Sequence, residues 1–225
     1  MRLGGAARKQ LAELIAGATS LRGDFFRSVA FRYFHPDDAI SGEGTRLYGG
    51  RFVPAGVRAV YASLEEETAL REVTIRKSAL GGRGQIGVGE YPRMTYVLSV
   101  ATNRNLDLAS TIPPELANVV RLCLRGKGYS VSQELAAIWI SEGIDSVIFP
   151  SATGVGRNVA VYLANACAGS VVVRNRAEVL AALRRPRVGK ARSVRDSFLT
   201  RNRPRSLHHF APNRPSLRLP GGLIA

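Results

Sequence analysis

The sequence predicts an α+β fold in which a mixed β core is flanked by helices and followed by a basic tail. Short segments with period-two alternation predict strands, and segments with the apolar spacing of helices lie between them. The strands are spaced too irregularly for a parallel doubly wound sheet. With 225 residues that are 45% hydrophobic and 22% charged, the chain can build one substantial core.

Charge and proline content divide the chain into three parts. The 32 Lys and Arg against 17 Asp and Glu give a formal net charge of +15. Eleven of these basic residues, a single acid and five prolines fall in residues 184–225, so two thirds of the net charge lies there. We predict an N-terminal helical segment over 1–21, a folded domain over 22–183 and a basic, proline-containing tail over 184–225.

The first elements of the chain follow from local periodicity. Residues 6–17 have the spacing of a short amphipathic helix. Residues 57–62 alternate, which predicts a strand with Tyr61 near its end. Ser63 stands three residues before Glu66, which is the spacing of a capping box and predicts a helix from there to about residue 76.

The later part of the domain combines strands with one helix. Residues 95–100 and 146–149 are bounded by turn or proline signals and predict strands. Between them, residues 133–140 predict a helix that stops at Gly143. Two further strands are expected, over residues 158–163 and 170–173.

Metal sites and structural disulfides are not expected. Cys123 and Cys167 lie far apart and form no Cys-x-x-Cys pair, and two of the three histidines, His208 and His209, fall in the tail. This pattern lacks the spacing of metal ligands and fits a reducing cytoplasm.

Membrane insertion and secretion are not expected either. Arg8, Lys9 and Glu13 interrupt the N-terminal segment, which argues against a secretory signal peptide. The longest apolar stretch, residues 159–173, is broken by polar residues and is too short to span a bilayer. We therefore expect a cytoplasmic protein with no membrane partner.

Residues 82–87 match the dinucleotide motif G-x-G-x-x-G, and Asp107 lies at about the distance expected of a ribose-binding acid. In that motif a strand comes first, and the N-terminus of the following helix faces the phosphates. Here a predicted helix comes first and a strand follows. We therefore interpret residues 82–87 as a loop.

The residues that favour an anionic substrate lie nearer the N-terminus. Arg32 is followed by Tyr33, and the run Gly49-Gly50-Arg51-Phe52 comes soon after. Glycine lets the backbone approach an anion closely, and arginine offers a forked set of donors. Arg32 and Arg51 are thus candidates for binding phosphate, the alternative for Arg51 being a surface cation at a turn.

Tyr61 and Glu72 belong to adjoining predicted elements, the strand and the helix after it. Glu72 has apolar neighbours on its helix, unlike the cluster of three glutamates over 65–67. We therefore expect its carboxylate to face the domain. The alternative is an ion pair with Arg76, at i+4 on a solvated helix face.

Taken in order, these motifs resemble the RES-domain family of bacterial toxins, and the likeness covers about residues 25–173. The matching positions are Arg32 and Tyr33, the run 49–52, Tyr61, Glu72 in Thr-Ala-Leu-Arg-Glu, Ser151 after Pro150, and Asn158. One position departs from the family pattern: Val53 stands where asparagine is common. A hydrogen bond made by that amide must then be absent or supplied elsewhere.

The resemblance implies a fold like that of ADP-ribosyltransferases of the diphtheria-toxin type. It also implies consumption of NAD, which would be a substrate and not a cofactor, by hydrolysis, phosphorolysis or transfer to a protein. The family's members are usually encoded beside an Xre-type antitoxin, which is the expected protein partner.

The resemblance also implies roles for the matching residues. Glu72 is expected to stabilise the positive charge that develops on the ribose, with Arg51 and Tyr61 as its catalytic partners. NAD itself is expected to bind the following residues: Arg32, Tyr33, Arg51, Tyr61, Ser151 and Asn158.

Two other functions remain open at this point. The basic tail fits a nonenzymatic protein that binds nucleic acid through phosphate charge, without sequence specificity and with strong salt dependence. A protein-specific ADP-ribosyltransferase would use the same site residues with a protein as acceptor.

Overall fold

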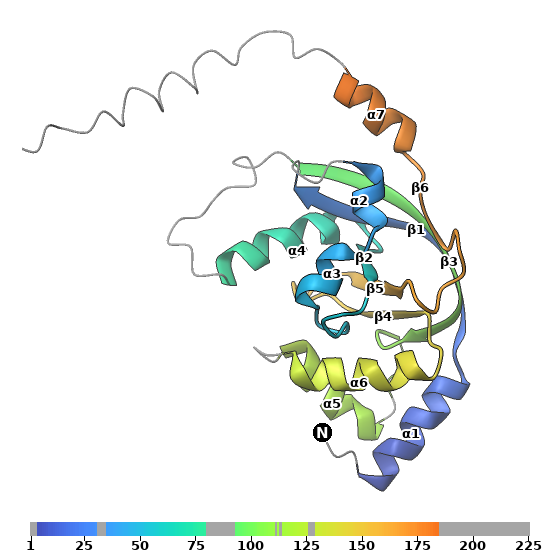
Figure 1. The fold of residues 1–225 in the computed structure, drawn as a ribbon. Helices are drawn as coiled ribbons and strands as arrows, with labels where there is room; N and C mark the ends of the chain where they lie inside the picture. Colours follow the sequence, from blue (N-terminus) through green and yellow to red (C-terminus); the bar gives the residue numbers. More distant parts are fainter. Residues whose placement is uncertain are drawn as a thin grey trace, which may run out of the picture. The chain divides into compact units, whose positions relative to one another are not determined.

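The structure, a computed structural model, describes residues 4–30, 35–79, 93–110, 112, 114–125 and 129–184 (Figure 1). Arg32, Tyr33 and the glycine-rich segment 82–87 lie outside the described residues, as does the tail beyond Arg184. The side chain of Arg76, the alternative partner of Glu72, also lies outside them.

Helices and strands alternate irregularly along the described chain. In order they are α1 (Gly5–Ala16), β1 (Thr19–Ala30), α2 (Pro36–Ile40), α3 (Glu43–Tyr48), β2 (Ala59–Ser63), α4 (Glu66–Ala79), β3 (Arg93–Asp107), α5 (Pro114–Arg125), α6 (Ser130–Ser141), β4 (Ser146–Pro150), β5 (Arg157–Tyr162), β6 (Val171–Val173) and α7 (Arg176–Arg184).

The six strands form one mixed sheet that closes on itself. Their order is β1-β2-β5-β4-β3-β6, and β1 also pairs with β3 along nearly its whole length. This extra pairing joins β1 to β3, which are the two ends of the series β1-β2-β5-β4-β3, and so closes that series. The β3–β4 pairing is parallel and the others are antiparallel.

Alternation along the strands produces two separate cores. The first is built almost entirely from the strands, and all six contribute to it, through residues such as Phe25, Leu98 and Val161. The second lies on the opposite face of β2, β4 and β5, which α1, α5 and α6 cover (Figure 1). Trp139, Tyr162 and Phe52 are its largest fully buried side chains. Two cores served by one sheet explain why β5 is buried along most of its length.

The mixed α+β prediction is confirmed, and the predicted strands and helices are present with shifted ends. The expected strand 95–100 is the middle of the longer β3, which extends because it pairs with β1. Asp107, at the end of β3, accepts hydrogen bonds from the backbone N–H groups of Ala109 and Ser110 and so stabilises the turn that follows.

The capping-box prediction at Ser63 is wrong. Ser63 is the last residue of β2, where it pairs with Asn158, and α4 begins three residues later at Glu66. The Ser63 hydroxyl donates to Asn158 Oδ1, and among the described residues no backbone N–H of the first turn of α4 donates to it.

Among the described residues, no helix combines the length and the apolar character needed to span a membrane. Within the same part of the chain, no three or more His, Cys, Asp or Glu residues gather in a way that could hold a metal ion.

The two cysteines should differ strongly in reactivity. Burial raises the pKa of the Cys123 thiol to about 11, although the nearby Arg51 charge opposes this, whereas Cys167 is exposed. Because the thiolate is the reactive form, iodoacetamide at pH 8 is expected to label Cys167 in the native protein and Cys123 only after unfolding. Mass spectrometry of labelled peptides measures this, and equal labelling of both cysteines in the native protein would contradict it.

Candidate active site

Glu72 is the centre of a hydrogen-bond network that joins α4 to β5 and to the loop after β4. One carboxylate oxygen, Oε1, accepts hydrogen bonds from Ser151 Oγ at 2.6 Å, Asn158 Nδ2 at 2.7 Å and the Ala152 backbone N–H at 3.0 Å. Three donors on one oxygen fix the position of the charged group. The structure therefore brings together Glu72, Ser151 and Asn158, which the sequence places up to 86 residues apart.

The Ser151 loop is shaped so that it can approach α4. It links β4 to β5 and closes with a hydrogen bond from Ser151 N–H to the Gly156 carbonyl at 3.0 Å. Gly156 has φ +76°, and a Cβ on it would lie 2.0 Å from Thr68 Oγ1 of α4. Only glycine accommodates both the backbone angle and this close approach. The loop can thus place Ser151 against Glu72.

Asn158 lies at the start of β5 and is held from its other side. Its register partner on β2 is Ser63, whose hydroxyl donates to Asn158 Oδ1 at 2.7 Å. The amide therefore joins Ser63 to Glu72, accepting from the first and donating to the second.

Tyr61 lies two residues before Ser63 on β2 and so shares its sheet face. Its ring meets Phe149 edge-on with centroids 6.1 Å apart, and its hydroxyl accepts a hydrogen bond from the Phe52 backbone N–H at 3.2 Å. A Cβ on Gly50 would lie 2.5 Å from that hydroxyl. The second glycine of the Gly-Gly-Arg motif thus makes room for Tyr61. From the sequence, the glycines of this motif were expected to let the backbone approach an anion.

Arg51 follows Gly50 in the same turn, but its guanidinium is directed to the helices. Nη1 donates to the carbonyl of Leu124 near the end of α5, and the group lies over the Tyr129 ring, 5.7 Å from its centroid. Within the described part of the chain, no hydrogen bond joins Arg51 to Glu72. The two residues are connected through Tyr61, which contacts the Arg51 turn at one end and shares a strand with Ser63.

Two side chains that the sequence did not indicate, Gln133 and Tyr162, hold the Arg51 turn. Gln133 Nε2 on α6 donates to the Gly50 carbonyl at 2.9 Å and to the Val53 carbonyl at 3.3 Å. Val53 itself is fully buried in the second core. An amide side chain therefore does bond to this turn, from a helix 80 residues away and not from position 53. No local sequence signal marks Gln133 for this function.

Tyr162 holds the same turn from the core. Its hydroxyl donates to the Phe52 carbonyl at 2.9 Å and accepts from Trp139 Nε1 at 2.8 Å. Burial, with a smaller contribution from Tyr61, raises the pKa of Tyr162 well above its ordinary value. The hydroxyl therefore remains a proton donor across the physiological pH range.

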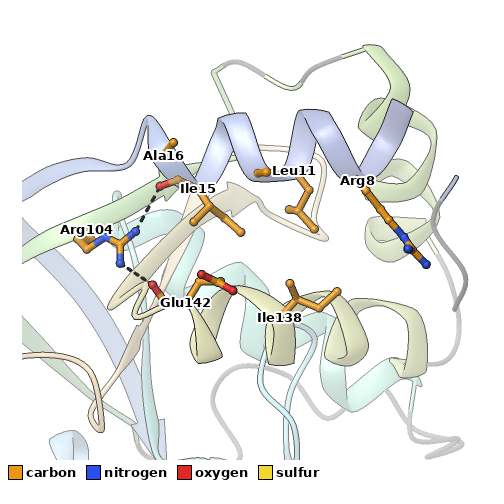
Figure 2. Close-up of a pocket in the computed structure, with 8 residues that line it drawn as sticks. Arg8, Leu11, Ile15, Ala16, Arg104, Ile138 and Glu142 are labelled. Atoms are coloured by element: carbon orange, nitrogen blue, oxygen red, sulfur yellow. Dashed lines mark hydrogen bonds between the residues drawn. The ribbon is translucent and has the colours of Figure 1, made fainter. Parts of the chain in front are cut away.

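A cavity of about 630 Å³ lies elsewhere, between α1 and α6 (Figure 2). Its lining residues are Arg8, Leu11, Ala12, Ile15, Ala16, Arg104, Ile138 and Glu142. Arg104 closes one end by donating to the carbonyls of Ile15 and Glu142 (Figure 2). No residue of the Glu72 network lines this cavity. We nevertheless place the candidate active site at Glu72, because three hydrogen-bond donors fix its carboxylate.

Comparison with known proteins places the chain in a family. The model of the RES domain matches residues 24–183. Among solved structures, the chain is similar to one in the M. tuberculosis MbcT–MbcA toxin-antitoxin complex, with a TM-score of 0.62 and 21% identity over 77% of this chain and 91% of that chain. A search of curated proteins gave no match. The structural likeness confirms the fold, and the domain match covers most of the chain, so this protein belongs to the RES-domain family.

Proposed function

We propose that the protein is a toxin that consumes NAD by breaking its nicotinamide–ribose bond, and that a cognate antitoxin of the Xre type neutralises it. The observation that carries the proposal is the Glu72 carboxylate, half-buried and held on a single oxygen by three donors. Membership of the RES-domain family and likeness to a chain from a toxin-antitoxin complex support it.

Cleavage of this bond requires a negative charge close to the ribose. The transition state resembles an oxocarbenium ion, as in glycoside hydrolysis, with positive charge on the anomeric carbon and ring oxygen. Nicotinamide leaves as a neutral molecule, so no general acid is needed. A carboxylate already fixed in position stabilises the developing charge without reorganising during the reaction. We assign this role to Glu72.

Tyr61 would bind the nicotinamide ring of the substrate, and the arginines would bind its diphosphate. The face of a tyrosine ring attracts the cationic nicotinamide ring, and Tyr61 lies on the same sheet face as the residues that hold Glu72. Guanidinium groups bind diphosphate through charge-assisted hydrogen bonds. The Arg51 fork has five N–H donors, so its bond to Leu124 does not exhaust it. Arg32 is proposed as the second phosphate ligand.

The test is incubation of the purified protein with NAD and measurement of nicotinamide and the ribosyl product. We expect equimolar loss of NAD and release of nicotinamide. The second product identifies the acceptor: ADP-ribose for water, its phosphorylated form for phosphate, or a protein carrying one added ADP-ribose by mass spectrometry. Absence of nicotinamide release with each of these acceptors present would overturn the proposal.

A further inference from the structure

The Glu72 network extends one step beyond the residues with proposed roles, to Ser63. Ser63 and Asn158 are only 4% and 7% exposed. Ser63 is paired on both sides, with Phe26 of β1 and Asn158 of β5, so its backbone cannot shift without disturbing two strands. Its hydroxyl lies 2.7 Å from Asn158 Oδ1, and Asn158 Nδ2 lies 2.7 Å from Glu72 Oε1.

Chemistry fixes the direction of this chain of hydrogen bonds. An ionised carboxylate can only accept, so the Asn158 amide must present its NH₂ group to Glu72. The amide oxygen then faces Ser63, and the hydroxyl must donate to it. Without the Ser63 hydroxyl, the buried Asn158 amide oxygen would lack a hydrogen-bond donor. The opposite orientation of the amide would place its oxygen against the Glu72 carboxylate.

The orientation of the amide determines which carboxylate oxygen remains for the substrate. Oε1 receives the bonds from Ser151, Asn158 and Ala152. Among the residues whose side chains the structure describes, which excludes Arg76, none bonds to Oε2. A carboxylate held in this way can rotate little, so the second oxygen keeps one position relative to the sheet face that carries Tyr61.

We infer that Ser63 is a positioning residue that acts through Asn158 to orient Glu72, so that Oε2 faces the ribose of the substrate. This inference rests on the proposed function and adds a residue that contacts no reacting atom. It predicts that loss of the Ser63 hydroxyl lowers kcat and leaves KM for NAD nearly unchanged, because Tyr61 and the two arginines proposed to bind NAD remain in place.

Ser146 provides a matched control. It is also buried on a strand, and its hydroxyl also donates to an asparagine side-chain oxygen, that of Asn105 at 3.0 Å. Ser146→Ala therefore removes the same kind of buried hydrogen bond away from Glu72. The Ser146 hydroxyl also bonds to the Thr102 hydroxyl at 2.7 Å. We therefore expect Ser146→Ala to lower stability at least as much as Ser63→Ala, while only Ser63→Ala lowers kcat, by roughly 10- to 100-fold.

The closing experiment is a double-mutant cycle between Ser63 and Asn158, read by nicotinamide release and by thermal unfolding. If Ser63 acts through Asn158, the Ser63→Ala/Asn158→Ala variant loses no more turnover than Asn158→Ala alone. If Ser63→Ala does not fold, Ser63→Cys keeps a weaker donor of similar size and is expected to give intermediate kcat.

The outcomes separate the inference from the proposed function. Losses that multiply in the double variant, or a kcat loss in Ser146→Ala equal to that in Ser63→Ala, would overturn the role of Ser63 while wild-type turnover upholds the NAD chemistry. Unchanged kcat in both Ser63 variants would overturn it as well. Absence of nicotinamide release by the wild type would overturn both.

Discussion

Glu72→Gln is expected to lower the rate of nicotinamide release by roughly 10²- to 10³-fold, with little change in KM for NAD. The glutamine carbonyl oxygen can take the place of Oε1 and accept from Ser151, Asn158 and Ala152. The substitution thus keeps the shape of the network and removes only its charge. Because that charge is proposed to act in the transition state, kcat should carry the loss.

A control for this prediction lies on the same helix. Glu67 is exposed and pairs with Arg71 one turn later, so Glu67→Gln makes the same chemical change on a solvated face. Such pairs contribute about 0.3–0.5 kcal/mol, and turnover should be unaffected. Steady-state rates of nicotinamide release for the two variants provide the comparison. If Glu72→Gln retained more than a third of wild-type kcat, the charge would not be catalytic.

The fold could be predicted where its causes are local. The alternation before Tyr61 and the helical spacing around Glu72 are properties of neighbouring residues, and β2 and α4 lie close to their predicted positions. β1 was not predicted, because Gly23 and Asp24 interrupt its alternation and its partner strand begins more than 60 residues later. Closure of the sheet depends on this pairing, and therefore also escaped prediction.

The candidate site shows the same division between local and distant causes. Glu72, Ser151 and Asn158 could be predicted as members of one site from the order of their motifs. Their mutual contacts could not, because each depends on strand register and on the loop held at Gly156. Ser63 shows why local spacing was not enough. Its spacing to Glu66 indicated a helix cap, but its hydroxyl bonds to a residue 95 positions away.

Gly50→Ala is expected to reduce both stability and turnover, because the added methyl would occupy the space of the Tyr61 side chain. The Cβ would lie 2.5 Å from the hydroxyl and 2.7 Å from the ring. The ring cannot simply move aside, since Phe149 packs against it and the Phe52 N–H bonds to its hydroxyl. We expect a loss of roughly 1–3 kcal/mol in the free energy of unfolding, typical of overpacking, and about a tenfold or greater fall in kcat/KM as Tyr61 shifts.

Gly44→Ala separates the effect of crowding at Tyr61 from the general effect of losing a glycine. Gly44 lies in α3, and a Cβ there would meet nothing within 4 Å. Urea unfolding and nicotinamide release should therefore show unchanged or slightly raised stability and full turnover in this variant. Since Gly50 does not have the positive φ found at Gly49, the backbone itself would accept alanine. Wild-type turnover in Gly50→Ala would thus mean that Tyr61 can move without consequence for the reaction, and would remove it from the catalytic set.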